Sequence, residues 1–391
     1  MTVLAPPRLA PRYDAVIIGA RCAGAATARL LARAGLRVLV ADRGRHGTDT
    51  LSTHALMRAG VLQLHRWGVL PAIQAAGTPV VRRATFTYGA DQLPVPIKPR
   101  DGVEGLYAPR RRVLDRVLVD AALAAGAVVE YGLRLIDLLR SLDGRVVGAV
   151  LLSEDGRAYR VETPLVIGAD GVRSTVAHLV DAPVTRAGHA AAGVVYGYWA
   201  RLPVDGYRWY FQSGASAGAI PTNDEETCVF AVTPADRFAE VFRGDVAAGY
   251  RRVIAEAAPE LVERLRAAEL RGTFHGFPGL PGYFRRSAGP GWALVGDAGC
   301  FKDPITAHGI TDALIAAELL ATAVVAGSDA ALAQYEASRN AMATPIFDVT
   351  ERIASFAWTL AEVRGLHRTL SEEMAREVTA MAAHNAAGVP A

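Results

Sequence analysis

The sequence predicts an α/β fold in which an antiparallel β-sheet is inserted into a parallel-sheet domain and helices form the C-terminal part. Three observations lead to this expectation. Residues 13–42 show the pattern of a strand, a glycine turn, a helix and a second strand. Two later segments, 165–175 and 291–325, each carry an apolar strand that stops at a glycine next to an aspartate. Between them, residues 186–286 alternate aromatic and small side chains, which is typical of antiparallel strands.

The first segment begins with a short apolar run, Val16 to Ile18, that suits a buried parallel strand and ends at Gly19. Strong helix formers follow from 25 to 34, and residues 37–40, apolar after Arg37, return as a second strand. A helix that starts at such a turn presents free N–H groups and a partial positive charge, so a pyrophosphate is the expected ligand. Asp42 closes the second strand, where its carboxylate can accept hydrogen bonds from ribose hydroxyls.

One position departs from the glycine fingerprint G-x-G-x-x-G. Gly19 and Gly24 hold the first and third glycine places, but Arg21 stands at the second, where a missing side chain lets the backbone approach the phosphates. Arg21 must therefore either point away or contact phosphate with its own guanidinium. The same turn contains Ala20 and Ala23. A glycine-rich turn is a weak signal by itself, and a βαβ unit without a nucleotide is the alternative at this point.

Composition and charge restrict the class of protein. With 391 residues, of which 51% are hydrophobic, the chain is long enough for two domains with large cores. Its net charge of +3 gives no reason to expect a nucleic acid or an anionic membrane as a partner. The three cysteines are far apart and have no zinc-type spacing, which fits a reducing compartment. We therefore expect a cytoplasmic protein without a metal.

Two segments bear on membrane association. Residues 1–12 contain three prolines and no apolar core, so we interpret them as a short disordered arm rather than a signal peptide. The most apolar later helix, expected from about 309 to 325, contains Asp312 and Glu318. These carboxylates favour burial in protein rather than in lipid, and we expect no integral membrane segment.

The segment after the second strand is polar, includes Arg43, and leads to a helical pattern over 55–70. Ser52 or Thr53 is expected to cap this helix. His54 lies at the same turn. A capping or solvent-facing histidine and a histidine beside a cofactor ring are equally open interpretations here.

The chain then leaves the first domain and returns to it. Residues 78–97 are β-branched and punctuated by prolines, which predicts a hairpin of a separate sheet. An amphipathic helix follows Arg111 and ends at Gly126, and further strands are expected around the turns Asp143-Gly144 and Asp155-Gly156. The strand that begins the second glycine segment stops at Asp170-Gly171, where the Asp170 carboxylate can reach ribose or ribityl hydroxyls.

The third glycine segment repeats this arrangement. A short strand over 292–295 runs into Gly296-Asp297, and a loop with Pro304 leads to a long helix that begins near Gly309. A second helix N-terminus is thereby aimed at a ligand. The rest of the chain is expected to be helical to about residue 383.

The region 186–286 is expected to form the inserted antiparallel sheet, with one helical excursion near 246–270. The glycine-rich run 214–218 lacks a βαβ context, and we interpret it as a turn. Strand alternation places Tyr196 and Tyr198 on one face. By the same rule, Trp209 and Phe211 share a face of another strand. Such aromatics are more often core packing than substrate contacts.

In this order and spacing, the three glycine segments resemble the FAD-dependent monooxygenases of the p-hydroxybenzoate hydroxylase fold, the single-component flavoprotein hydroxylases. The likeness covers nearly the whole chain. It implies an FAD-binding Rossmann-like domain of the GR2 type with an inserted antiparallel β-sheet substrate domain and C-terminal helices. The implied ranges are 1–77, 107–185 and 287–345 for the FAD-binding domain, 78–106 and 186–286 for the substrate domain, and 346–391 for the C-terminal helices.

The resemblance also assigns roles to matching positions. The turn from Gly19 to Gly24 resembles the dinucleotide fingerprint of the family, and Asp42 matches the acidic residue on the adenosine ribose, which is usually Glu. Arg111, in the pattern R-x-x-L-D-x-x-L, matches an arginine associated with the flavin. Asp170-Gly171 matches the family's Asp-Gly motif.

The third segment carries the remaining assignments. Gly296-Asp297 matches the Gly-Asp motif whose aspartate binds the ribityl chain, and residues 304–310 resemble the loop and helix start that lie against the isoalloxazine. The cofactor-binding residues expected in all are Gly19, Ala20, Arg21, Ala23, Gly24, Asp42, Arg43, Thr53, Arg111, Asp170, Gly171, Gly296, Asp297, Pro304, Gly309 and Ile310. The catalytic candidates are His54, Tyr198 and Pro304.

The function implied is that of an FAD-dependent monooxygenase of the secondary-metabolite type, acting on a hydrophobic, aromatic or polycyclic small molecule. The composition, rich in Ala, Arg and Gly, indicates a bacterium with a GC-rich genome. NAD(P)H, as a transient co-substrate, would reduce FAD, molecular oxygen would add at the flavin C4a, and the hydroperoxide would deliver one oxygen atom. Backbone N–H groups at Gly309 and Ile310 would stabilise charge on the reduced ring. A tyrosine hydroxyl or His54 would deprotonate a phenol or orient a carbonyl. We expect a monomer or a homodimer.

The same fold also carries other activities. The loop residues 303–306, Asp-Pro-Ile-Thr, resemble geranylgeranyl-reductase-like enzymes, and His308 stands where the hydroxylases often carry Gln or Lys. An FAD-dependent reductase or dehydrogenase acting on a C=C bond is therefore the alternative. A halogenase is weaker, because residues 198–203 do not reproduce the motif Trp-x-Trp-x-Ile-Pro. A flavin-free scaffold or carrier is favoured by Arg21 alone.

Overall fold

The computed structural model describes residues 9–52 and 54–387. Its first sheet has six strands in the order β17-β18-β9-β1-β2-β5, and the pairs are parallel except β17–β18. The α/β class expected from the sequence is confirmed. The strands are β1 (Ala15–Ile18), β2 (Val38–Asp42), β5 (Val128–Tyr131), β9 (Val166–Gly168), β17 (Ala288–Gly289) and β18 (Trp292–Leu294).

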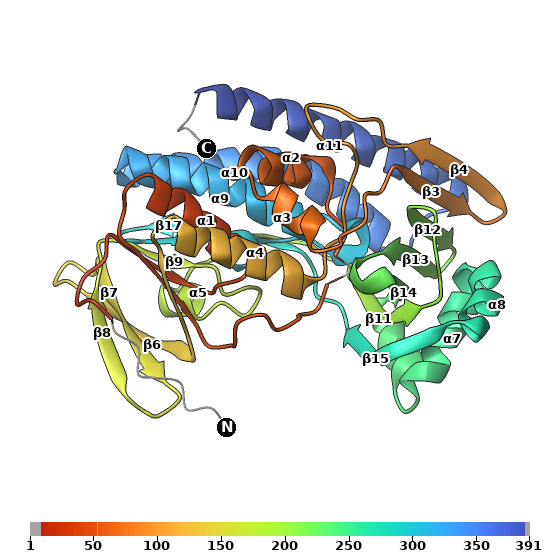
Figure 1. Cartoon of the computed structure of the whole chain (residues 1–391), viewed down its shortest axis with the longest axis horizontal. Helices are drawn as coiled ribbons and strands as arrows, with labels where there is room; N and C mark the ends of the chain where they lie inside the picture. The colour runs from red at the N-terminus through yellow and green to blue at the C-terminus, as the bar shows by residue number, and fades with distance from the viewer. Residues whose placement is uncertain (1–8, 53, 388–391) are drawn as a thin grey trace.

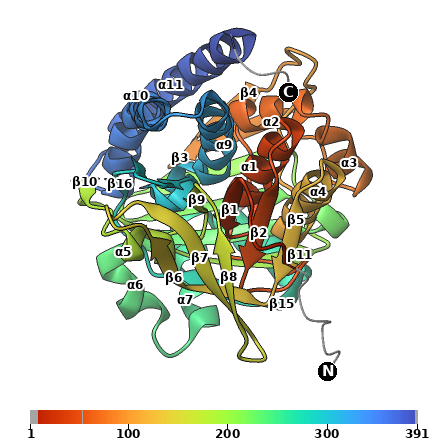
Figure 2. The ribbon, with the colours of Figure 1, turned by 90° about the vertical axis from the view of Figure 1, so that its left-hand side faces the viewer.

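Both faces of this parallel sheet are covered, as Figure 2 shows. Ala15 and Ile17 of β1 face the helices, whereas Val16 and Ile18 face a three-stranded meander, so the strand is apolar throughout. The predicted strands around the two Asp-Gly turns form this meander. The covering elements are α1 (Cys22–Arg33), α4 (Arg111–Ala124) and α9 (Gly309–Ala326) on one face and β6 (Leu133–Arg140), β7 (Val146–Ser153) and β8 (Ala158–Glu162) on the other.

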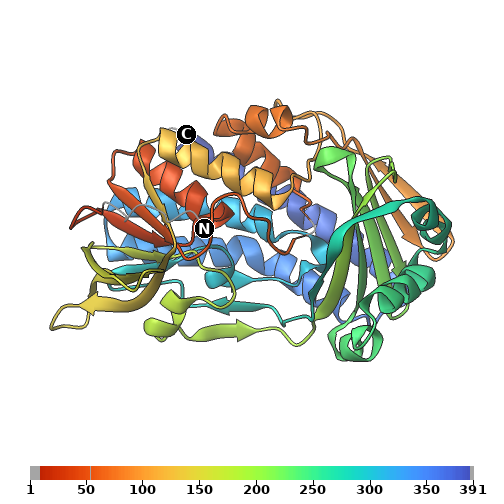
Figure 3. The ribbon, with the colours of Figure 1, turned by 60° about the horizontal axis from the view of Figure 1, so that its bottom comes forward.

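A second sheet has seven strands in the order β15-β11-β14-β13-β12-β3-β4, and all its pairs are antiparallel except β12–β3. It lies at the opposite end of the molecule from the meander (Figure 3). The predicted hairpin forms its edge. The strands are β3 (Arg83–Tyr88), β4 (Asp91–Pro96), β11 (Ala192–Ala200), β12 (Tyr207–Gln212), β13 (Ala215–Pro221), β14 (Thr227–Pro234) and β15 (Glu269–Phe277).

The faces of the second sheet follow the predicted alternation. Tyr196, Tyr198, Trp209 and Phe211 belong to the large core shared with the first domain, whereas Tyr210 points to the opposite face. That opposite face packs against helices. These are α6 (Ala235–Phe242), α7 (Val246–Ala257) and α8 (Pro259–Ala267).

One local expectation for this region was incomplete and another was wrong. The helical excursion expected near 246–270 is present as α7 and α8, but a further helix, α6, precedes it directly after β14. The run 214–218 is not a turn as a whole. Only Gly214 has the left-handed φ of +71°. Ala215 begins β13, which pairs with β12 and β14 and is buried on both faces, where small side chains are accommodated.

Two long helices complete the fold and are labelled in Figure 1. Helix α10 (Asp329–Ala354) runs across the boundary expected at residue 345, and the division into sequence ranges stays a prediction. Helix α11 (Leu360–Ala387) packs along α10 and α2 (Arg58–Arg66) and reaches the second sheet. There, Tyr88 Oη and His367 Nδ1 are 3.0 Å apart. The smaller elements are α3 (Leu70–Ala75), α5 (Thr175–Leu179), β10 (Val184–Ala187), β16 (Tyr283–Arg285) and β19 (Cys300–Phe301).

Helix α9 is long and apolar enough to cross a membrane by length and composition. In this fold, however, 61% of its residues are buried inside the protein. Its buried Glu318 accepts a hydrogen bond of 2.7 Å from Trp67 Nε1. The helix therefore serves here as a core helix.

Candidate active site

In the first glycine turn, the backbone of Gly24 packs directly against the backbone of Gly19. A Cβ atom on Gly24 would lie 1.8 Å from the carbonyl oxygen of Gly19, and Gly19 itself has a φ of +108°. Helix α1 starts directly after this turn with no side-chain cap and no acidic residue in its first turn. Its first N–H groups therefore have no partner within the helix, and the turn forms a cradle suited to a phosphate.

Arg21, the departure from the fingerprint, points away from this cradle. Its Nη1 lies 3.0 Å from Asp115 Oδ2 and 3.3 Å from the carbonyl oxygen of Thr48. The sequence left open whether Arg21 points away from the phosphates or contacts them. The structure has the first arrangement, in which an acidic residue of α4 holds the side chain. The backbone of the turn is thereby left accessible to a phosphate.

Asp42 ties the end of β2 to the turn. Its carboxylate accepts hydrogen bonds from the backbone N–H groups of Ala20, at 2.7 Å, and Gly44, at 2.6 Å. The neighbouring Arg43 is exposed. Thr53, expected to contact the cofactor, lies outside the described residues. Each carboxylate oxygen has two lone pairs, so Asp42 retains acceptor capacity for ribose hydroxyls.

Asp297 faces the same cradle from the third glycine segment. The left-handed Gly296, with a φ of +63°, packs so closely that its Cβ would lie 2.9 Å from Ala23 Cβ. Burial raises the pKa of Asp297 to about 6, although the positive charge of Arg111 opposes this rise. Arg111 in turn lies 3.0 Å from Asp115. An acidic, half-buried side chain is thus held beside the start of α1.

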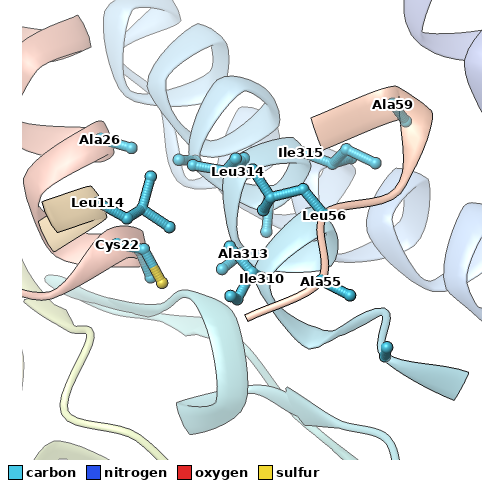
Figure 4. Packing of buried hydrophobic residues seen from close by; sticks show 14 of the residues in the cluster. Cys22, Ala26, Ala55, Leu56, Ala59, Leu114, Ile310, Ala313, Leu314 and Ile315 are labelled. Atoms are coloured by element: carbon cyan, nitrogen blue, oxygen red, sulfur yellow. The ribbon is translucent and has the colours of Figure 1, made fainter. Parts of the chain in front are cut away.

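The N-terminus of α9 closes this side of the site. A Cβ on Gly309 would lie 4.0 Å from Asp297 Oδ1, and α9 begins with no side-chain cap. Figure 4 shows Ile310 of α9 beside Cys22 of α1. The loop before the helix contains Pro304, which opens a short 3₁₀ turn. Two uncapped helix N-termini therefore converge on one region, which favours an anionic ligand.

Asp170 has a different environment from the one that its strand-end position suggested. Its carboxylate accepts hydrogen bonds from Ser174 Oγ, at 2.5 Å, and from the backbone N–H of Thr175, at 2.6 Å. Burial raises its pKa from the ordinary value. The following Gly171 has a φ of +79° and open space where a Cβ would be. Asp170 is therefore engaged at the start of α5, and its contact with a cofactor stays a prediction.

The segment 52–57 joins the two halves of the site. The Ser52 N–H donates to Tyr196 Oη at 3.1 Å, and the Met57 N–H donates to Thr311 Oγ1 in α9 at 3.1 Å. The expected helix cap at residue 52 or 53 was wrong, because α2 begins at Arg58 after Met57. Contacts of residues 56 and 57 to Tyr107 and to α9 override the local capping preference.

His54 lies in this segment, and its Nε2 is hydrogen-bonded to Tyr198 Oη. Its backbone has a left-handed φ of +68°, and its side chain is buried. Burial lowers the pKa of His54 to about 3 and raises that of Tyr198. Both groups are therefore neutral at pH 7. Of the interpretations that the sequence left open for His54, capping and solvent exposure are excluded.

Sequence analysis missed the charges around this pair. The guanidinium carbon of Arg110 lies 3.4 Å from the centroid of the Tyr198 ring. Arg110 also forms ion pairs with Asp49, at 2.5 Å, and with Glu226, at 2.8 Å. One signal was present. Three consecutive arginines at a helix start, residues 110–112, oppose the helix dipole and therefore require acidic partners.

A second missed group lies at the start of α9. The possible ligand atoms of His308, Asp312 and Glu377 all lie within 4.8 Å of one another, although the sequence showed no metal-ligand spacing. Lys302 Nζ lies 2.6 Å from Asp312 Oδ1. Glu377 comes from α11, so this group could not be recognised before the fold was known.

A sequence model of the family described as "FAD binding domain" matches residues 12–350. The chain belongs to this family of FAD-dependent oxidoreductases. This identifies FAD as the cofactor, with NAD(P)H as the co-substrate that is typical of the family. The expected fold, an FAD-binding domain with further sheets and C-terminal helices, is confirmed as well.

Curated relatives of this FAD-dependent oxidoreductase include reductases of lipids and quinones. It is 30% identical to digeranylgeranylglycerophospholipid reductase 1 of Methanopyrus kandleri over 330 residues, which cover 78% of each protein. It is 27% identical to menaquinone reductase of Mycolicibacterium smegmatis over 335 residues, which cover 81% of this chain and 77% of the relative.

Solved structures share the fold at lower identity. The flavin-dependent brominase Bmp2 superposes with a TM-score of 0.79 at 20% identity, covering 94% of this chain and 93% of its own. PqsL of Pseudomonas aeruginosa, solved in complex with 2-aminobenzoylacetate, superposes with a TM-score of 0.77 at 22% identity. That match covers 91% of this chain and all of PqsL.

Proposed function

We propose that this FAD-dependent oxidoreductase is a monooxygenase that oxygenates a hydrophobic, aromatic or polycyclic small molecule. One observation carries the proposal. The buried, neutral His54–Tyr198 pair stands in an aromatic wall, and the segment that carries His54 also contacts the start of α9. A substrate held there would lie between the second sheet and the expected position of FAD.

The residues described above fit the cofactor. The cradle between Gly19 and Gly24 would take the pyrophosphate, Asp42 would accept from the adenosine ribose, and Asp297 would accept from the ribityl chain. The two uncapped helix N-termini would balance its negative charge. When bound and reduced by NAD(P)H, FAD supplies the activation of molecular oxygen, of which one atom enters the substrate and the other forms water.

The aromatic wall would select and orient the substrate. Tyr196 stacks on His275 with ring centroids 5.1 Å apart and meets Tyr198 edge to face at 5.7 Å. Flat apolar surfaces of this kind favour aromatic and polycyclic molecules and exclude water. His54 Nδ1 is buried and has no hydrogen-bond partner among the described residues. It would therefore hold a hydroxyl or carbonyl of the substrate.

The role of the pair follows from its charge state. A histidine with a pKa of about 3 is a weak base at pH 7. The pair would therefore orient the substrate by hydrogen bonds more than it would remove a proton. We therefore give hydrogen bonding by His54 more weight than the expected deprotonation of a phenol.

A reductase acting on a C=C bond is the second candidate. Two observations favour it. Relatives with 27–30% identity are named as reductases of a digeranylgeranylglycerophospholipid and of menaquinone. The loop 303–306, Asp-Pro-Ile-Thr, also resembles that branch. The same apolar wall would then hold a polyprenyl chain instead of an aromatic ring.

Product analysis separates the two candidates. The FAD-loaded protein would be supplied with NADPH or NADH and ¹⁸O₂, with phenolic polycyclic compounds and a polyprenyl lipid as alternative substrates. A monooxygenase incorporates one ¹⁸O atom and consumes oxygen in proportion to product. A reductase forms a product with two additional hydrogen atoms under anaerobic conditions. A protein that binds no FAD would contradict both.

A further inference from the structure

Four ionisable side chains meet at the start of α9, away from the His54–Tyr198 pair. His308 Nε2 lies 3.1 and 3.0 Å from the two carboxylate oxygens of Glu377, and Lys302 Nζ lies 2.6 Å from Asp312 Oδ1. His308 and Asp312 are 3.8 Å apart. The side chains of His308 and Lys302 are almost completely buried.

This arrangement does not favour a metal ion, although three of the side chains could be ligands. The ammonium of Lys302 already occupies the place of a cation beside Asp312. Glu377 likewise has a partner in His308. With His308 protonated, two positive groups face two negative groups, and the buried cluster is neutral.

The cluster fixes the charge of His308. Burial alone would lower the pKa of this histidine, but the carboxylates of Glu377 and Asp312 outweigh burial and raise it. Lys302 acts in the opposite direction. Among the described residues, these three are the charged groups closest to the ring, and they come from the loop before α9, from α9 itself and from α11.

The cation stands at the edge of the site expected to hold FAD. His308 is the residue directly before α9, and the next residue, Gly309, faces Asp297. His308 Nδ1 is buried and has no hydrogen-bond partner among the described residues. A buried N–H of a cation without a partner is costly, so the site would gain free energy from an acceptor or a negative charge next to it.

We propose that Glu377 is a positioning residue that keeps His308 positively charged at the start of α9, so that the site binds reduced FAD more tightly than oxidised FAD. Reduction adds negative charge to the cofactor, and a fixed cation beside it favours the more negative state. The inference rests on the FAD site of the proposed function. It does not depend on whether the reaction is an oxygenation or a reduction.

The first test is the midpoint potential of bound FAD in the wild-type protein and in Glu377→Gln. The substitution keeps the shape of the side chain and removes its charge. We expect the ratio of affinities for reduced and oxidised FAD to fall about tenfold, which lowers the midpoint potential by about 30 mV. Glu372→Gln removes the same charge from the exposed face of α11 and should leave the potential unchanged.

The double variant checks that Glu377 acts through His308. His308→Gln alone should lower the potential by a similar amount, and adding Glu377→Gln to it should have little further effect. A structural role for Glu377 would instead lower the melting temperature or the FAD content without moving the potential. If Glu377→Gln does not fold, His308→Gln together with Glu372→Gln still tests the charge at this position.

The charge of His308 can also be read in the FAD-free protein. Side-chain ¹⁵N NMR at pH 7.5 should show both His308 nitrogens protonated in the wild type and a neutral imidazole in Glu377→Gln. A neutral His308 in the wild type, or an unchanged potential in Glu377→Gln, would overturn the inference while leaving the FAD assignment intact. A wild-type protein that binds no FAD would instead overturn the proposed function.

Discussion

Arg110 lies over the ring of Tyr198, with its guanidinium carbon 3.4 Å from the ring centroid. Asp49 and Glu226 balance the charge of this arginine. Burial raises the pKa of Tyr198 against the opposing charge of Arg110, so the tyrosine remains a neutral phenol. The contact fixes the plane of the ring and leaves the hydroxyl free to meet His54.

Tyr198→Phe should therefore test the hydrogen bond that orients the substrate without changing the packing of the ring. The ring stays under Arg110, but its hydrogen bond to His54 is lost. We expect kcat/KM to fall about tenfold, the equivalent of one hydrogen bond of about 1.4 kcal/mol, with FAD content unchanged. Tyr210→Phe is the matched control, because Tyr210 lies on the opposite face of the sheet and its hydroxyl has no hydrogen-bond partner among the described residues. Equal losses in both variants would argue against a role for the pair.

Asp297→Ala should weaken FAD binding at least tenfold, because it removes a half-buried acceptor beside the cradle. The sheets should remain folded. Fluorescence titration of the FAD-free protein with FAD gives the dissociation constant, and circular dichroism monitors the fold. Flavin content equal to that of the wild type would count against the place assigned to this carboxylate.

Asp297→Asn should stabilise the FAD-free protein at neutral pH. The folded-state pKa of Asp297, about 6, is raised above its ordinary value of 3.8. Its contribution to stability is therefore fully present below about pH 4 and is lost as pH rises through about 6. Asparagine is neutral at every pH, so urea unfolding at pH 7.5 should show a gain of about 1–3 kcal/mol over the wild type. At pH 4 the difference should nearly vanish, and a constant difference would contradict this account.

Gly24→Ala should disrupt the glycine turn. The new Cβ would lie 1.8 Å from the carbonyl oxygen of Gly19, a distance that requires the backbone to move. We expect a loss of about 2 kcal/mol or more in the free energy of unfolding, together with loss of FAD binding. Gly365→Ala is the control, since its Cβ would meet no atom within 4 Å at a half-buried position of α11. That variant should be neutral or slightly more stable.

Acid should weaken the contact between α11 and the second sheet. Burial lowers the pKa of His367 from 6.5 to about 3. Stability from this group is present above about pH 6.5 and is lost as pH falls towards 3, because the unfolded chain takes up a proton that the folded protein excludes. His367→Phe should therefore lose less stability than the wild type between pH 7 and pH 5, measured by urea unfolding. An identical pH dependence would show that His367 does not titrate in this way.

The sequence predicted those parts of the fold that are encoded locally. The βαβ start, the two later glycine segments and the faces of Tyr196 and Tyr198 follow from periods of a few residues, and the structure has them. The start of α2 was placed wrongly, because the backbone N–H groups of residues 56 and 57 donate hydrogen bonds to the Tyr107 carbonyl and to Thr311 Oγ1 instead of starting a helix.

Contacts between distant elements were the least predictable part of the site. Glu377 reaches His308 across 69 positions of sequence, and neither residue carries a local pattern that indicates the other. The same holds for Arg110 and its partner Glu226. These pairs arise from the packing of α11 and of the second sheet, which periodicity does not specify. From their positions in the sequence, these charged residues indicate only that each needs a partner of opposite charge, and not which residue that partner is.

Helix α11 contacts the second sheet through His367 and the start of α9 through Glu377. The two residues lie about 15 Å apart along a rigid helix, so displacement of one contact displaces the other. A ligand that shifts the sheet would then alter the contact that sets the charge of His308. Thermodynamic linkage requires the reverse as well, and electron transfer to the cofactor would change the affinity of the sheet for its ligand by the same factor. This single helix would thus make substrate binding and reduction cooperative.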